Sequence, residues 1–232
     1  MLNRPHSKAL AVAAAMLVSA CSTLQNAALP IAAALTPSVE AGEIVAGPPS
    51  ADVAAAEMRV VRGPWDEARV AQARYDDQFD PFIAFAPVMG AGFTAENYPN
   101  SAEALRRVRT PLGAAVLVAK NRFGRDRPFV VDATITPCIE ASDSLRASGA
   151  YPSGHAAFGW AWALVLAELN PDRADAILAR GREYGDSRVV CGVHYPSDVE
   201  AGRTVAAAAL ARLHADPDFR AALDAARAEW RR

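Results

Sequence analysis

The sequence is poor in cysteine and in aromatic residues and carries almost no net charge. Aromatic residues make up 7% of the 232 residues, and the formal net charge is −2. Because it has neither a basic field nor an aromatic-plus-basic stripe, nucleic acid is not an expected partner. After residue 20 no apolar run reaches the roughly 18 residues that a membrane-spanning helix needs. The run Ala156–Ala167 is too short, so a polytopic membrane protein is not expected.

The N-terminus has the composition of an export signal. Arg4 and Lys8 precede a stretch of mostly small apolar residues over 9–20, which is typical of a secretory signal and too short to span a bilayer. We therefore predict a signal peptide over residues 1–20 and a location in the periplasm or cell envelope. Its removal takes away two positive charges and no negative charge, which changes the net charge from −2 to −4.

Two outcomes stay open for the mature N-terminus. The run Leu17-Val-Ser-Ala-Cys21 resembles a bacterial lipobox, which makes Cys21 a candidate for lipidation and the protein a candidate outer-membrane lipoprotein. The alternative is ordinary cleavage at a nearby small residue, such as Ala28, without a lipid anchor.

Only three cysteines are present. If Cys21 is lipidated or removed, Cys138 and Cys191 remain, and an even pair in an exported protein indicates a disulfide. The alternative interpretation is that both are small buried hydrophobic residues.

The rest of the chain predicts one helical domain. Residues 21–53 are rich in alanine, proline and glycine, which indicates an irregular leader, and residues 54–232 form the expected domain. Hydrophobic residues make up 52% of the chain, enough for a single core. Strand-like signals are confined to Phe129–Ile135. The expected fold class is therefore all-α, a single-domain helical bundle.

Helix-start and helix-stop signals divide this domain into segments. Residues 77–99 are rich in proline, glycine and aromatic residues and are expected to form a loop. Thr110-Pro111 is expected to separate two helices, because proline favours the first position of a helix. The expected helices are 54–76 with a break at Gly63-Pro64, 100–109, 111–121, 155–169, 171–184, 197–215 and 217–230.

Three blocks of the sequence, residues 120–128, 152–155 and 187–198, concentrate groups that bind phosphate or transfer protons. The mature chain has only three histidines, His155, His194 and His214. Two of them fall within these blocks, and this concentration is more informative than either histidine alone. The third, His214, is expected to have a structural role.

The cations of these blocks suit a phosphoryl group. Lys120 provides a mobile ammonium, and Arg127 and Arg188 provide planar guanidinium groups that match phosphoryl oxygens. Arg122 and Arg125 are expected to lie in a solvated loop. Residue types alone do not decide between Arg125 and Arg127 as the phosphate ligand.

The second block is expected to begin the central helix. Ser153 can donate a hydroxyl hydrogen bond, and Gly154 allows its backbone N–H to approach an anion closely. His155 then lies at the helix N-terminus, where free N–H groups and the helix dipole favour a bound anion.

The third block pairs a histidine with a carboxylate. His194 and Asp198 are four residues apart, and Pro196 between them marks the expected start of a helix. From that first turn Asp198 can reach one ring nitrogen of His194, which would fix the tautomer and leave the other nitrogen free to attack.

Together the blocks resemble the pattern of the type 2 phosphatidic acid phosphatase superfamily: Lys-x6-Arg-Pro, Pro-Ser-Gly-His and Ser-Arg-x5-His-x3-Asp. Every fixed position is present, in order. From about Lys120 to Trp230 the sequence looks most like the bacterial class A non-specific acid phosphatases, and the resemblance becomes weak before residue 50.

The resemblance implies a helical bundle and an acid phosphatase that needs no metal or other cofactor and acts on small phosphate monoesters. It implies that His194 is the nucleophile of a phosphohistidine pathway, that Asp198 orients it and that His155 is the general acid. The implied phosphate-binding residues are Lys120, Arg127, Ser153, Gly154 and Arg188. Paired cysteines of the family resemble Cys138 and Cys191.

Other functions stay open at this point. A lipid or polyprenyl phosphate phosphatase of the superfamily would have the same blocks, but those enzymes are generally polytopic. Vanadium haloperoxidases share the pocket chemistry but are typically much longer, and a non-catalytic envelope lipoprotein could keep the fold. No metal-ligand spacing is found outside the blocks. Homo-oligomers are common in the branch that the chain resembles.

Overall fold

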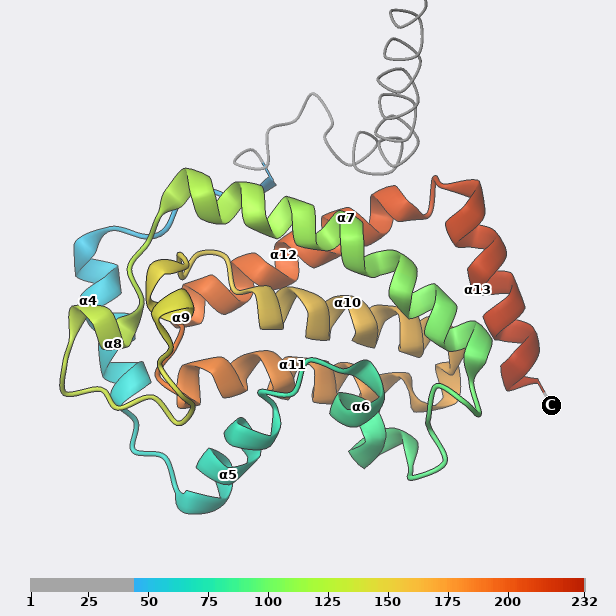
Figure 1. Ribbon diagram of the computed structural model, residues 1–232, viewed down its shortest axis with the longest axis horizontal. Helices are drawn as coiled ribbons and strands as arrows, with labels where there is room; N and C mark the ends of the chain where they lie inside the picture. Colours follow the sequence, from blue (N-terminus) through green and yellow to red (C-terminus); the bar gives the residue numbers. More distant parts are fainter. Residues whose placement is uncertain (1–43, 232) are drawn as a thin grey trace, which may run out of the picture.

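The computed structural model describes residues 44–231, and all regular structure in this range is helical (Figure 1). The expected all-α class is confirmed. The predicted signal peptide, Cys21 and most of the predicted leader lie outside the described residues. The elements are α4 (Ala51–Arg62), α5 (Glu67–Tyr75), α6 (Pro81–Met89), α7 (Pro99–Phe123), α8 (Pro128–Val131), α9 (Asp143–Ala147), α10 (Gly154–Leu169), the 3-10 turn Pro171–Arg173, α11 (Ala174–Val190), α12 (Pro196–Leu213) and α13 (Pro217–Trp230).

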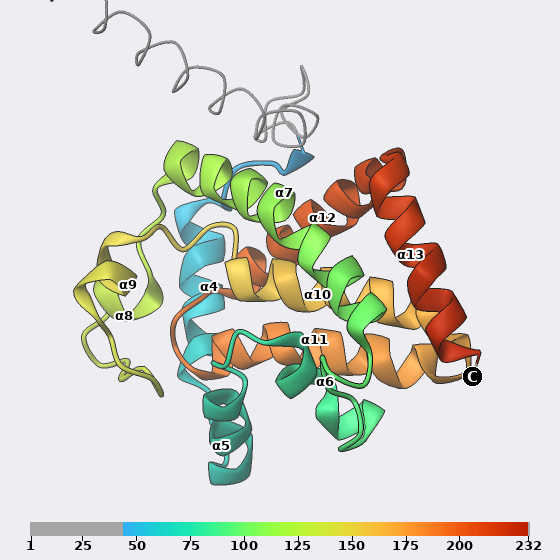
Figure 2. The ribbon, with the colours of Figure 1, turned by 45° about the vertical axis from the view of Figure 1, so that its right-hand side comes forward.

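Helix α10 is the centre of the bundle, because it is apolar around most of its circumference and none of its residues is exposed. It packs against α11 on one side and against α12 and α7 on the others (Figures 1 and 2). Helix α13 closes one end against α7, and α5 and α6 pack against α11. Helix α4 contacts α11 and α12 at the end where the first turns of α10 and α12 lie.

Two glycines permit the close approach of these helices. A Cβ at Gly181 of α11 would lie 2.4 Å from the Cβ of Ala163, and one at Gly202 of α12 would lie 2.5 Å from the carbonyl oxygen of Ser153. A real Cβ essentially never comes within 3.0 Å of such a non-bonded atom, so both positions require glycine. The contact at Gly202 brings the start of α10 against α12, which carries Asp198 in its first turn.

Two expected helices form one. Helix α7 runs from Pro99 to Phe123 and contains Pro111 in its interior. An interior proline costs roughly 3 kcal/mol of helix stability. The apolar face continues on both sides of it, however, with Val108 and Leu112 fully buried, so tertiary packing outweighs the break.

Part of the expected loop 77–99 is a helix. Asp80 caps α6 by accepting hydrogen bonds from the backbone N–H groups of Phe82 (2.7 Å) and Ile83 (3.3 Å), and Pro81 takes the first helical position. The aromatic and apolar residues after it pack against the core, including the fully buried Phe85. Here the cap and the burial override the loop-like composition.

Two further segments differ from the sequence expectation. The segment 129–135, expected to be extended, begins with the short helix α8, because Pro128 occupies the first helical position. Helix α11 continues past Tyr184 to Val190 and so includes the start of the third block.

The end of the expected leader is packed structure. Val45 is 4% exposed and belongs to the main core, and the hydroxyl of Tyr151 donates a hydrogen bond to the carbonyl oxygen of Ala46 (2.6 Å). Helix α4 begins at Ala51, within the segment expected to be irregular. Packing against the domain therefore starts before residue 54.

Candidate active site

The three blocks meet where α10 and α12 begin and α7 and α11 end. Ser153 donates its backbone N–H to the carbonyl oxygen of Asp198 (2.8 Å), which joins the second block to the third. The Nη1 atom of Arg127 lies 3.1 Å from Nε2 of His194, which joins the first block to the third. Lys120 lies in the last turn of α7 and is one of the charges that act on His194.

His194 is 3% exposed and has a different partner on each ring nitrogen. Its Nδ1 lies 3.2 Å from Oδ2 of Asp198, and its Nε2 faces the guanidinium of Arg127. A carboxylate only accepts and a guanidinium only donates, so Nδ1 carries the proton and Nε2 keeps its lone pair. Burial lowers the pKa of His194 well below its usual value, as do the charges of Arg127, Lys120, Arg188 and His155. The ring is therefore neutral, and Nε2 is a candidate nucleophile.

Asp198 is fully buried and held from three sides. Oδ2 accepts the backbone N–H of Tyr195 (2.8 Å), a capping interaction at the start of α12, in addition to His194. Oδ1 accepts a hydrogen bond from Nη1 of Arg125 (2.6 Å). Burial raises the pKa of Asp198 to about 6, and Arg125 opposes this effect. The carboxylate lies where the four-residue spacing predicted it.

Arg188 has hydrogen-bonding capacity that the described residues do not use. It is 2% exposed, and Nη2 donates to Oδ1 of Asp77 (2.9 Å). Its Nε and Nη1 are buried without a hydrogen-bond partner in the described part of the chain. A buried donor without a partner costs roughly 1–3 kcal/mol, and more when it is charged. A phosphoryl oxygen would satisfy these N–H groups.

The other two proposed phosphate-binding cations, Arg127 and Lys120, donate hydrogen bonds to backbone oxygens. Arg127 donates to the carbonyl oxygens of Leu145 (2.8 Å), Ser148 (3.1 Å) and Val193 (2.9 Å). Lys120 donates from Nζ to the carbonyl oxygen of Gly149. Burial, reinforced by Arg127, lowers the pKa of Lys120 to about 7. Lys120 is therefore cationic at acidic pH and loses its charge as the pH rises through 7.

Helix α10 begins at Gly154, as the second block predicted, and its first N–H groups have no partner within the helix. The hydroxyl oxygen of Ser153 accepts the N–H of Ala156 (3.3 Å). Nε2 of His155 lies 3.2 Å from the carbonyl oxygen of Asp77, and its ring packs against the edge of Phe79. Burial and the charge of Arg188 lower the pKa of His155 to about 4.

Asp77 is a site residue that the sequence interpretation missed. It contacts both Arg188 and His155, yet no motif spacing connects it to them. The motif serine Ser187 supports it from behind, because its hydroxyl donates to Oδ2 of the adjacent Asp76 (2.5 Å). Ser187 is therefore a support for the Asp76–Asp77 segment.

The prediction of a solvated position is wrong for Arg125. Its side chain is 10% exposed and donates to Ser197 (2.8 Å), Asp198 (2.6 Å) and Glu57 (3.0 Å). The carboxylates of Glu57 and Asp198 compensate the buried charge of Arg125. The sequence does not reveal this pairing, because Glu57 lies in α4, far from Arg125 along the chain. Arg122 is exposed, as expected.

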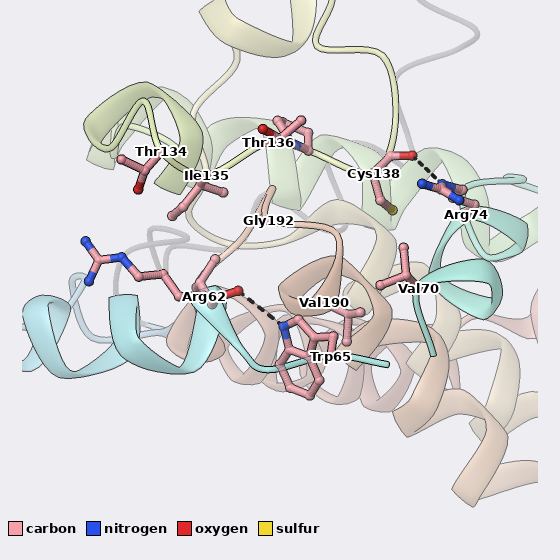
Figure 3. Close-up of a pocket in the computed structure, with 12 residues that line it drawn as sticks. Arg62, Trp65, Val70, Arg74, Thr134, Ile135, Thr136, Cys138, Val190 and Gly192 are labelled. Carbon is pink, nitrogen blue, oxygen red and sulfur yellow. Dashed lines mark hydrogen bonds between the residues drawn. The ribbon is translucent and has the colours of Figure 1, made fainter. Parts of the chain in front are cut away.

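Cys138 and Cys191 form a disulfide with a Cα–Cα distance of 4.7 Å. Cys191 directly follows α11, so the bond ties the segment around Cys138 to the turn before His194. Figure 3 shows the pocket beside it, whose wall includes Cys138, Thr136 and Gly192. Arg74 donates from Nε to the carbonyl oxygen of Cys138 there (3.2 Å). None of the proposed catalytic or phosphate-binding residues lines this pocket.

Removing the disulfide should destabilise the domain strongly. It closes a loop with a sequence separation of 53, for which loss of chain entropy in the unfolded state predicts about 4 kcal/mol of stabilisation. We expect Cys138→Ser/Cys191→Ser to lower the free energy of unfolding in urea by 2–4 kcal/mol, taking the range typical of disulfides. Adding reductant to the variant is the control and should change nothing. Equal stabilities of the variant and the oxidised protein would contradict the prediction.

His214 lies outside this cluster, at the end of α12. Its Nε2 is 3.1 Å from Oε2 of Glu168. Between residues 44 and 231 no group of three His, Cys, Asp or Glu side chains is arranged to hold a metal ion. In the same range no helix is both long enough and apolar enough to cross a membrane.

The fold and the site define a class: an all-helical protein with a buried histidine–carboxylate pair surrounded by cations. Residues 110–221 match the family model described as the PAP2 superfamily. This range contains all of the proposed catalytic and phosphate-binding residues. Residues 110–221 therefore belong to the PAP2 superfamily, and the resemblance stated from the three blocks is confirmed.

Curated relatives extend the comparison. The non-specific acid phosphatase of Providencia stuartii is 43% identical over 148 residues, covering 63% of this chain and 60% of the relative. That of Salmonella typhimurium (strain LT2) is 43% identical over 146 residues, covering 62% and 58%. The acid phosphatase of Zymomonas mobilis is 42% identical over 146 residues, covering 62% and 55%. The matches thus span less than two thirds of the length of these relatives.

Proposed function

We propose that this protein is an exported acid phosphatase that hydrolyses small phosphate monoesters through a phosphohistidine intermediate, without a metal ion. The observation that carries the proposal is the neutral, buried His194, whose Nε2 faces the guanidinium of Arg127 and whose pKa is also lowered by the charges of Lys120 and Arg188. The N–H groups of Arg188 that have no hydrogen-bond partner among residues 44–231 support a phosphoryl group as the anion bound there. The relatives named as non-specific acid phosphatases support the same activity.

In the first step the phosphoryl group would bind between the cations and the start of α10. Nε2 of His194 attacks phosphorus as the bond to the leaving oxygen breaks, and Asp198 stabilises the positive charge that develops on the ring. Lys120, Arg127 and Arg188 stabilise the charge on the equatorial oxygens, a role that metal ions fill in many other phosphatases. His155 gives a proton to the leaving alkoxide, which departs as the alcohol.

In the second step water attacks phosphorus in line with the N–P bond. His155, neutral after the first step, accepts a proton from the attacking water. The N–P bond breaks, its electron pair returns to Nε2 of His194, and inorganic phosphate leaves. Both histidines end in their starting protonation states, so the cycle balances.

Two groups favour acidic pH. Lys120 is fully cationic only below its pKa of about 7. His155 has a pKa of about 4, so it needs a source of protons at moderately acidic pH. A monoester has a second pKa near 6 and arrives as a monoanion below that pH. We propose that this proton, or the charge of the bound phosphoryl group beside His155, brings the ring to its acid form.

The test is an assay of the mature chain on p-nitrophenyl phosphate from pH 4 to pH 9. We expect an acidic optimum, full activity in EDTA, and inhibition by vanadate. Loss of activity in EDTA that zinc or magnesium restores would contradict the metal-free mechanism. A parallel assay with detergent-solubilised phosphatidate distinguishes small monoesters from lipid substrates. Faster turnover of phosphatidate than of p-nitrophenyl phosphate would favour the lipid phosphatase alternative.

Export and lipid attachment at Cys21 remain proposals that rest on residues 1–21. The names of the relatives are consistent with an exported protein. Homo-oligomers also remain a proposal.

A further inference from the structure

The carboxylate that orients His194 is itself held by a buried arginine. Arg125 donates from Nη1 to Oδ1 of Asp198 (2.6 Å), the oxygen that does not contact His194. Its guanidinium also lies over the ring of Tyr195, with Cζ 3.8 Å from the ring centroid. Both contacts fix the plane of the guanidinium against the first turn of α12.

Glu57 of α4 completes this arrangement. Its Oε2 accepts from Nη2 of Arg125 (3.0 Å), and Oε1 accepts the backbone N–H of Ser197 (2.6 Å) at the start of α12. The hydroxyl of Ser197 joins the two, since it accepts from Arg125 and donates to Glu57. The side chains of Arg125 and Glu57 are 10% and 11% exposed, so this network is largely shielded from water.

The charges of the network matter because Asp198 is completely buried. A buried carboxylate tends to take up a proton, and two carboxylates beside one another strengthen that tendency. Arg125 lies between Glu57 and Asp198 and pairs with both. The groups that interact with Asp198 are Arg125, Lys120, Arg127, His194, Tyr151 and Tyr195, and Glu57 is connected to it through Arg125. Of these, only Arg125 is a cation hydrogen-bonded to the carboxylate.

We propose that Arg125 and Glu57 are positioning residues for the nucleophile: Arg125 keeps Asp198 ionised and aimed at His194, and Glu57 holds Arg125 in place. This inference rests on the proposed function. Glu57 lies outside residues 110–221, so a helix beyond the matched family range contributes to the reacting centre.

The test compares Arg125→Gln with the double variant Glu57→Gln/Arg125→Gln. Loss of an adjacent opposite charge typically moves the pKa of a carboxyl group by 1–3 units. For Arg125→Gln we expect the midpoint of the acidic limb of the kcat–pH profile to rise by about 1 pH unit or more. Each unit of this rise lowers kcat at pH 5 roughly tenfold. KM should change little, because Arg125 does not belong to the phosphate-binding cations.

The double variant separates positioning from simple support. Removing Glu57 as well eliminates the other carboxylate that Arg125 pairs with, so less negative charge remains near Asp198. The double variant should therefore recover part of the kcat lost at pH 5. A structural role predicts the opposite, because the double variant has lost more hydrogen bonds. Arg125→Lys, which keeps the charge, should retain most of the wild-type pH profile, and the exposed Arg122→Gln is the matched control.

A readout without turnover keeps this proposal distinct from the proposed function. In protein with ¹³C-labelled aspartate, the Cγ resonance missing from Asp198→Asn identifies Asp198, and its titration midpoint should rise in Arg125→Gln. If wild-type protein hydrolyses no monoester but this midpoint still rises, the proposed function fails and the electrostatic coupling stands. An unmoved midpoint, or a loss of kcat that is equal at every pH, overturns the inference. If Arg125→Gln does not fold, the charge-balanced double variant and Arg125→Lys carry the comparison.

Discussion

His194→Ala is expected to lower kcat for p-nitrophenyl phosphate on the order of 10⁴-fold or more, as loss of a nucleophile commonly does. The substitution removes the only atom on which the phosphoryl group is proposed to be held. Rapid mixing with labelled substrate, followed by alkaline denaturation to protect a phosphoramidate bond, should trap labelled wild-type protein and no labelled variant. KM is not informative here, because so little turnover remains.

His214→Ala is the matched control for this experiment. It removes a histidine outside the three blocks, bonded to Glu168, and should keep both the activity and the trapped intermediate. A labelled His194→Ala protein would show that another residue is the nucleophile. The proposal that the cations and the start of α10 bind phosphate would then still stand, but the nucleophile would have to be assigned to another residue.

His155→Ala should produce a loss that depends on the leaving group. General acid catalysis typically contributes 10²–10⁴-fold, and an alkoxide needs the proton far more than p-nitrophenolate does. We therefore expect a loss of kcat in this range for glycerol phosphate and a clearly smaller loss for p-nitrophenyl phosphate. The measurement is the ratio of the two kcat values in wild type and variant.

The phosphoenzyme supplies the internal control for His155→Ala. With p-nitrophenyl phosphate the variant should still form it, and the intermediate should accumulate because the second step lacks its base. Equal losses for both substrates would contradict the assignment of His155 as general acid. They would leave it with a role in binding or in packing against Phe79.

Local sequence signals predict the start of α10 and the contact between His194 and Asp198. A serine, a glycine and a histidine before an apolar run predict a helix N-terminus, and α10 begins at Gly154 with Ser153 as its cap. A proline between His194 and Asp198 predicts a helix start, and the first turn of α12 brings the carboxylate back to the ring. These are interactions between residues within four positions of each other, where chain geometry leaves few alternatives.

The incorrect predictions concern residues whose partners are distant in sequence. Pro111 was expected to begin a helix, but burial of the α7 face on both sides of it keeps one helix continuous. Arg125 was expected in solvent because its charge has no partner nearby in the chain. Its partners are Glu57, 68 positions away, and Asp198, 73 positions away.

Local patterns in the sequence are enough to predict the all-helical class, the central apolar helix and the three blocks that contain the proposed catalytic and phosphate-binding residues. These follow from periodicity, capping and spacing, which act over a few residues. Contacts between distant segments complete the proposed site, and these could not be predicted from the sequence: Asp77 contacts Arg188 and His155, and Glu57 and Arg125 lie behind Asp198. A buried charge is stable only beside its compensating partner, and folding brings that partner from another helix.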